Sequence, residues 1–348
     1  AVGALALDAN TTGNENVAVG YHALGANTTS GGNTAVGHAA LDAQVDGGHD
    51  NTAIGFKALS GNTSGDDNVA LGYEALLSNT DGDSNVALGF RALKANTTAD
   101  YNIAIGRFAM GVNTTGARNV AMGAFALDAN TTGTDNTAIG YQSLTSATEG
   151  NDNTAVGKES LKDNTTGSNN TALGFQALQN NTTASNNTAV GYEALDANTT
   201  GDTNVAVGNN ALDANTTGSG NTACGSFALT AATTGSENNA FGKSALGALT
   251  TASYNNAFGR EALRLNTTGA NNTAMGHEAL KANTTGSSCV AVGFEALNAN
   301  TTGVKNIAVG AGAGSSVTTG DKNLFLGFEA GKNQVTTDNN QLYIARAA

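Results

Sequence analysis

Asn187–Thr203 reads NTAVGYEALDANTTGDT, and close variants of this unit recur along the whole chain. The glycine of the unit, Gly191, has a counterpart every 17 residues, and there are twenty such glycines between Gly3 and Gly327. One unit, at 33–50, has 18 residues instead of 17. We number the unit from its asparagine, so that this glycine is position 5.

The length of the unit and its pattern predict the fold. Helical-hairpin repeats need about 33 residues, so the unit is too short for one. Positions 1–5 alternate as in a strand, Ala-Leu at positions 8 and 9 is a second apolar pair, and ANTTG at positions 11–15 suits a turn. We therefore expect two short strands and two turns in each unit, stacked as about 20 coils of an all-β parallel β-solenoid. The expected array covers residues 1–339, and a terminating strand follows at 340–348.

Differences between the units predict which positions are buried. Position 1 is Asn in 18 of the 19 complete units, and its amide can bond within its own coil and to the next asparagine. Position 5 is always Gly, which indicates a positive φ or a close backbone approach. Position 4 is always apolar and position 9 is Leu in 17 of 20 units, so we expect both in the core. The predicted structural ladder is represented by Asn187, Asn204, Asn221, Gly191, Gly208 and Gly225.

Charged and aromatic residues mark the expected surface. Of the 43 charged residues, 38 lie at positions 6, 7, 10, 16 and 17, which we expect to face solvent. Twelve of the 18 aromatic residues lie at position 6 or 7, on the same edge. This aromatic row is a candidate contact with other chains or with a glycan; alternatively, each ring folds over its own coil. Its members are Tyr21, Phe56, Tyr73, Phe90, Phe108, Phe125, Tyr141, Phe175, Tyr192, Phe227, Phe294 and Phe328.

Composition excludes several classes of partner and of protein. The pI near 4.5 and the 15 Lys and Arg residues scattered along the chain argue against nucleic acid as a partner. The sequence has no uninterrupted run of 18 apolar residues, so we expect no insertion into a membrane. Collagen is excluded because proline is absent, and 39% hydrophobic residues argue against disorder.

The sequence predicts no enzyme, no cofactor and no metal site. The histidines His22, His38, His49 and His277 have no Cys or carboxylate cluster beside them. Stacked carboxylates such as Asp196 and Asp213 lack a calcium-binding repeat pattern and are expected to be solvated. Cys224 and Cys289 are four coils apart, too far for a disulfide within the chain. No Ser/His/Asp set or carboxylate pair stands out.

The unit resembles the NSVAIG-type repeats in the YadA-like head of trimeric autotransporter adhesins. It resembles more closely the NTAVGYxALxxNTTG arrays of phage tail fibres and related surface fibres. The residues that carry this resemblance are Asn187–Gly191, Ala194, Leu195 and Asn198–Gly201. It implies a homotrimer of parallel β-solenoids side by side. The ending TTDNNQLYIARAA resembles the segment before a self-cleaving chaperone domain of tail fibres, so we expect a processed product or a fragment.

Two functions of different classes follow from these observations. The first is a stiff trimeric shaft of a virion tail fibre or bacterial surface adhesin, extracellular, that mediates attachment to a host receptor or glycan. The second is a monomeric solenoid that binds ice through its threonines or glycans through its aromatic row. Adjacent threonines such as Thr199 and Thr200 should point in opposite directions, which disfavours ice. A polysaccharide-cleaving enzyme ranks third, because no carboxylate pair can be located.

Overall fold

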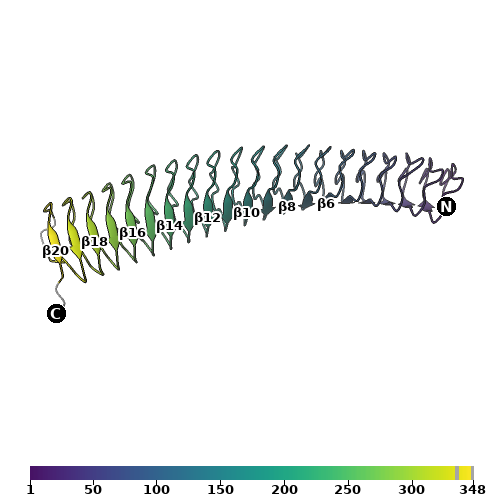
Figure 1. The fold of residues 1–348 in the computed structure, drawn as a ribbon. Coiled ribbons are helices and arrows are strands. Elements are labelled where there is room, and N and C mark those ends of the chain that lie inside the picture. The colour runs from purple at the N-terminus through teal and green to yellow at the C-terminus, as the bar shows by residue number, and fades with distance from the viewer. Residues whose placement is uncertain (334–336, 346–348) are drawn as a thin grey trace. The chain divides into compact units, whose positions relative to one another are not determined.

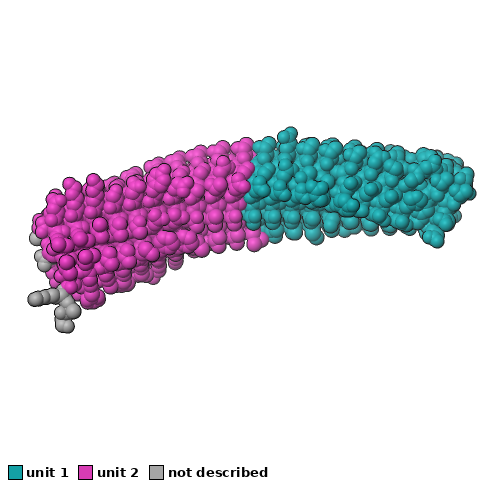
Figure 2. Space-filling view, in the orientation of Figure 1, with its two compact units in different colours: residues 1–172 teal, residues 173–348 magenta. Residues whose placement is uncertain are grey.

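The computed structural model describes residues 1–333 and 337–345, and these residues form short strands and turns with no helix. The chain divides into two compact units, residues 1–172 and residues 173–348 (Figure 2). In each unit, every coil contributes one short strand to a parallel sheet (Figure 1). Each unit is therefore a parallel β-solenoid with a 17-residue period.

The strands of the first unit are β1 (Val17–Val19), β2 (Thr34–Val36), β3 (Thr52–Ile54), β4 (Val69–Leu71), β5 (Val86–Leu88), β6 (Ile103–Ile105), β7 (Val120–Met122), β8 (Thr137–Ile139) and β9 (Thr154–Val156). Those of the second are β11 (Thr188–Val190), β12 (Val205–Val207), β13 (Thr222–Cys224), β14 (Asn239–Phe241), β15 (Asn256–Phe258), β16 (Thr273–Met275), β17 (Val290–Val292), β18 (Ile307–Val309), β19 (Leu324–Leu326) and β20 (Leu342–Ile344). The boundary between the units falls within β10 (Thr171–Leu173).

Each strand occupies positions 2–4 of its coil and pairs in register with the next strand. Two steps are 18 residues long: Thr34 pairs with Thr52, and Leu324 pairs with Leu342. The repeated glycines do not reveal the second step, because the last of them is Gly327. The segment 340–348 contains β20, and the ending TTDNNQLYIARAA includes residues 336 and 346–348, which lie outside the described residues.

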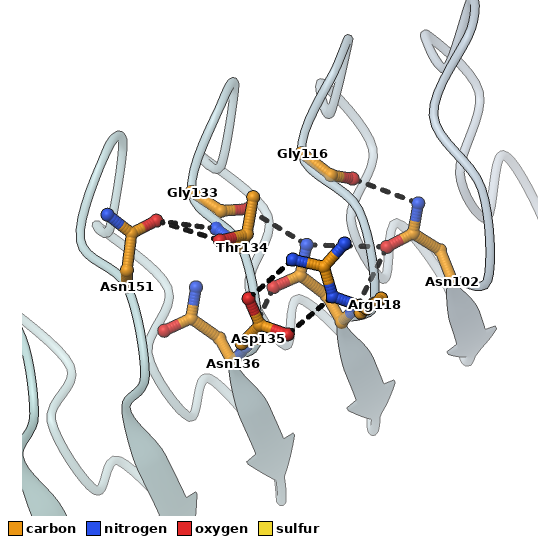
Figure 3. A network of polar contacts seen from close by, with 9 residues as sticks. Asn102, Gly116, Arg118, Gly133, Thr134, Asp135, Asn136 and Asn151 are labelled. Atoms are coloured by element: carbon orange, nitrogen blue, oxygen red, sulfur yellow. Dashed lines mark hydrogen bonds and ion pairs between the residues drawn. The ribbon is translucent and has the colours of Figure 1, made fainter.

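The asparagine at position 1 is buried and joins two coils. Oδ1 of Asn51 accepts a hydrogen bond from the backbone N–H of Asn68 (2.9 Å), and Nδ2 of Asn51 donates to the carbonyl of Gly65 in its own coil (2.8 Å). Figure 3 shows the same bond within another coil, from Nδ2 of Asn102 to the carbonyl of Gly116. The backbone N–H groups of Asn204 and Asn221 donate in the same way to Asn187 and Asn204.

A second buried column of asparagines lies at position 12, where the sequence pattern indicates only a turn. Nδ2 of Asn96 donates to Oδ1 of Asn79 (2.8 Å) and to the carbonyl of Ala99 in its own coil (2.9 Å). Ala147 interrupts the column, and Oδ1 of Asn130, one coil before it, is buried without a hydrogen-bond partner. A turn motif therefore also supplies part of the interior.

Glycine at position 5 is required for two reasons at once. Gly191 has a φ of +139°, and a Cβ there would lie 2.5 Å from the carbonyl oxygen of Gly208 on the next coil. Gly208 and Gly225 have φ values of +137° and +143° with similarly close contacts. Any larger residue at this position would strain its backbone and push adjacent coils apart.

The expected second strand at positions 8 and 9 is wrong, because these residues lie in a turn. Leu195 at position 9 has a φ of +56°, and Glu193 at position 7 has a φ of +50°. Residues with a Cβ seldom adopt this left-handed conformation. Complete burial of the Leu195 side chain and a hydrogen bond from its N–H to the carbonyl of Ala211 (3.0 Å) stabilise it in this turn. A short apolar pair alone does not distinguish a turn from a strand.

The expectation that position 4 lies in the core is also wrong. Side chains alternate along a strand, and in this sheet the middle residue points inward. Ala70 of β4 is fully buried, whereas its neighbours Val69 and Leu71 are 39% and 43% exposed. The interior therefore consists of alanines at positions 3 and 8, leucine at position 9 and the two asparagine columns.

The last coils keep the interior filled with a different pair of residues. Phe325 replaces alanine at position 3 and is buried, with its ring stacked on Tyr343 (centroids 5.2 Å apart). Gly314 and Gly331 replace leucine at position 9, and a Cβ on Gly331 would lie 2.5 Å from the Phe325 ring. In the last coil, the large interior side chain therefore stands at position 3, whereas in most other coils it stands at position 9.

Candidate functional site

The outward side of each sheet, made by positions 2 and 4, is an exposed apolar surface that we call the strand face. No repeat unit carries a charged residue at either position. Half-buried threonines lie between the apolar residues at many of the position 2 sites. In the first unit, the exposed apolar residues are Val2, Val17, Val19, Ile54, Val69, Leu71, Leu88, Ile103, Met122 and Ile139. In the second unit, they include Leu173, Val207, Phe241, Phe258, Met275, Ile307 and Val309.

The aromatic row lies beside the strand face, and its rings stack on rings of neighbouring coils. Phe56 and Tyr73 have centroids 5.1 Å apart, and Tyr73 and Phe90 5.3 Å. His38 occupies a place in the row between Tyr21 and Phe56. The exposed members, between 38% and 71% exposed, are Tyr21, Phe56, Tyr73, Phe90, Tyr141, Tyr192, Phe227, Phe294 and Phe328. The half-buried members are Phe108, Phe125 and Phe175.

Two threonines of each turn have different environments. The hydroxyl of Thr199 at position 13 donates to the backbone carbonyl of Thr216 on the next coil (3.0 Å), and the Thr199 side chain is half-buried. Thr200 at position 14 is exposed. Position 14 therefore forms a single exposed column, mostly of threonine, that Asp46, Ser64, Asp81 and Glu149 interrupt. An ice-binding surface should instead be flat and free of charge.

Some charged residues at positions 7 and 10 are less solvated than the sequence pattern indicates. The Glu261 side chain at position 7 is only 15% exposed; Lys281 (2.9 Å) and Arg260 bond to it and lower its pKa to about 2. Burial raises the pKa of the Asp128 carboxyl at position 10. These side chains lie against the turn. Position 17 is more exposed, as in the pair of Arg118 and Asp135 (2.7 Å; Figure 3).

The remaining candidate groups do not gather into a site. Cys224 is exposed on the strand face, Cys289 is buried at position 1, and both are free thiols. Burial raises the pKa of the Cys289 thiol. Across residues 1–333 and 337–345, no three His, Cys, Asp or Glu side chains are grouped to hold a metal ion, and no helix could cross a membrane.

In each unit the geometry therefore offers two repeated surfaces, the strand face and the aromatic row. No protein-family model matches the sequence, and no curated protein matches it.

Proposed function

We propose that this chain is the shaft of a structural fibre in which three copies pack side by side through their strand faces. The fibre would stand on a virion or a bacterial cell surface and mediate attachment to a host. The observation that supports this most is the exposed apolar strand face. The number of chains and the surface location rest on the resemblance of the repeat unit.

The strand face has the properties of a surface that another chain covers. Monomeric proteins seldom expose a long, continuous apolar patch, because covering it removes apolar area from water. Side chains such as Leu71 and Leu88 project outward from the sheet, whereas the backbones of their strands already pair with each other. A symmetric oligomer would bury the same face of every chain.

Sedimentation analysis tests this proposal on the whole chain, with variants on the strand face. We expect a mass three times the 34.5 kDa of one chain for the natural protein. Leu71→Glu with Leu88→Glu should reduce the mass to that of one chain, because carboxylates would be buried between chains. Thr98→Glu with Thr115→Glu, on the exposed threonine column of nearby coils, is the matched control. A single-chain mass for the natural protein would contradict the proposal.

The competing function is a monomeric solenoid that binds a ligand. The single exposed threonine column gives little support to an ice-binding surface. The stacked, exposed rings of the aromatic row favour a glycan instead, since saccharide rings pack their C–H faces on aromatic side chains.

A further inference from the structure

Several coils carry no aromatic ring at position 6 or 7, and one of them, in the second unit, lies between two coils that carry phenylalanine. Position 6 carries Phe294 in one coil and Phe328 two coils later, but Ala311 in the coil between them. The same coil has Gly312 at position 7 and Ser315 at position 10. The two flanking coils carry Glu295 and Glu329 at position 7. The coil between them therefore lacks the large side chains that both flanking coils have at positions 6 and 7.

This gap is a cavity, which we call the ring slot. It has a volume of about 300 Å³. Its lining residues are Phe294, Glu295, Ser315, Phe328, Glu329 and Lys332, together with Ala311 and Gly312 of the coil between the two phenylalanines. Its two phenyl rings are 52% and 71% exposed. The slot therefore combines apolar walls with charged groups at its edge, which is typical of a small-molecule site.

The dimensions of the slot match one six-membered ring. Elsewhere in the row, stacked rings on adjacent coils have centroids 5.1 to 5.7 Å apart, and His277 stacks on Phe294 at 5.5 Å. Positions two coils apart are separated by about 10 Å along the stack, since parallel strands are spaced by about 4.8 Å. Phe294 and Phe328 thus leave space for the one ring that Ala311 does not supply.

We infer that the ring slot binds a single pyranose ring of a neutral glycan. The phenyl rings would contact the two C–H faces of the sugar. The carboxylates of Glu295 and Glu329 would accept hydrogen bonds from its hydroxyls, and Ser315 and Lys332 would donate to them. A wholly aromatic ligand would leave these polar groups unused, and a second chain packed against the slot would bury the carboxylate of Glu295 and the ion pair of Lys332 with Glu329. The inference does not depend on the proposed fibre.

Binding of sugars to the natural 348-residue chain tests this inference. The probes are methyl α-glucoside, methyl β-galactoside and N-acetylglucosamine, followed by saturation-transfer NMR and titration calorimetry. Ala311→Phe should abolish binding, because it fills the slot with the residue that both flanking coils carry. Phe294→Ala should weaken binding at least tenfold.

Tyr192→Ala is the matched control for Phe294→Ala. Tyr192 is 49% exposed and stacks on Phe175 (5.2 Å), but it lies in another part of the second unit. This variant should bind sugar like the natural protein. The inference is overturned if no probe binds, if Ala311→Phe leaves binding unchanged, or if indole displaces the sugar and binds more tightly. If the natural chain bound sugar but had the mass of a single chain, the proposed fibre would be contradicted and the ring slot would not.

Discussion

At the scale of single residues, each amide in the position 12 column depends on the residue one coil away. An asparagine there donates to the coil before it and accepts from the coil after it, as Asn96 does between Asn79 and Asn113. When the next coil has alanine, an acceptor remains buried without a donor, as at Asn130 and Asn215. Such a group lowers stability because its hydration is lost without replacement.

Ala147→Asn should therefore raise the free energy of unfolding by about 1 kcal/mol. The new amide would donate to Oδ1 of Asn130, and neighbouring coils already accommodate asparagine at this position. Urea unfolding followed by circular dichroism measures the change. Ala129→Asn, one position earlier in the unit and outside the column, is the control and should give no gain. A lower urea midpoint for Ala147→Asn would show that the column does not stabilise the chain through these bonds.

Gly191→Ala should lower the free energy of unfolding by about 3 kcal/mol or more, through backbone strain and a steric clash. The added Cβ would lie 2.5 Å from the oxygen of Gly208, in a residue whose φ is +139°. Gly247→Ala is the control, because the nearest atom to its Cβ would be 3.3 Å away. Thermal unfolding measures both variants. Equal melting temperatures for the two would show that neither strain nor close approach explains the invariant glycine.

At the scale of one coil, the sequence allowed some features to be predicted and not others. The period, the ladder asparagines at position 1 and the glycine at position 5 follow from their near-invariance. Alternation shows that Val69 and Leu71 share a side of β4 and that Ala70 lies on the other, but not which side is inward. The inward side is set by the width of the coil, which admits alanine at position 3 opposite leucine at position 9. That width depends on left-handed turn residues such as Leu195, which no local propensity indicates.

The exchange of large residues in the last coils predicts a strong coupling between two positions. Phe325→Ala alone should destabilise the chain by about 3 to 5 kcal/mol, because it leaves a cavity in the interior. Gly331→Leu alone should also destabilise it, since its Cβ would lie 2.5 Å from the Phe325 ring. Together they restore the usual pairing of Ala and Leu.

The double variant should therefore be more stable than the sum of the two single changes indicates. Urea unfolding of all four proteins in a double-mutant cycle measures the coupling. Additive effects would show that the two residues do not share one packing space.

The ion pairs of Glu261 with Lys281 on the next coil and with Arg260 on its own coil predict a pH dependence of stability. The Glu261 carboxylate, held by Lys281 and Arg260, has a pKa lowered to about 2 from the usual 4.5. A lowered folded-state pKa stabilises the protein above pH 4.5, and this contribution is lost as the pH falls toward 2. Glu261→Gln should therefore lower the urea midpoint at pH 7 and have a smaller effect at about pH 3. The exposed Glu149→Gln is the control; an equal effect of Glu261→Gln at both pH values would contradict the assignment.

At the scale of the whole molecule, near-identical coils carry information about function mainly where they differ. The ring slot exists because Ala311 and Gly312 depart from their neighbours. The strand face is the opposite case, since position 4 is apolar in every coil and no charge enters at position 2. A feature kept in all coils suits a contact along the length of another chain, whereas a feature of one coil suits a compact ligand.

Distances between identical spin labels can show which surface the chains share. Cys224 lies exposed on the strand face at the end of β13, and Cys289→Asn removes the other thiol while restoring the usual residue of position 1. In a symmetric oligomer packed through strand faces, a label on Cys224 should lie close to its equivalents and give one short distance. With Cys224→Ser, a label at Thr200→Cys on the exposed turn should give a longer distance, and one at Tyr192→Cys an intermediate distance. If Tyr192→Cys gave the shortest distance, the aromatic row and not the strand face would join the chains. If no label showed coupling between chains, the fibre proposal would fail.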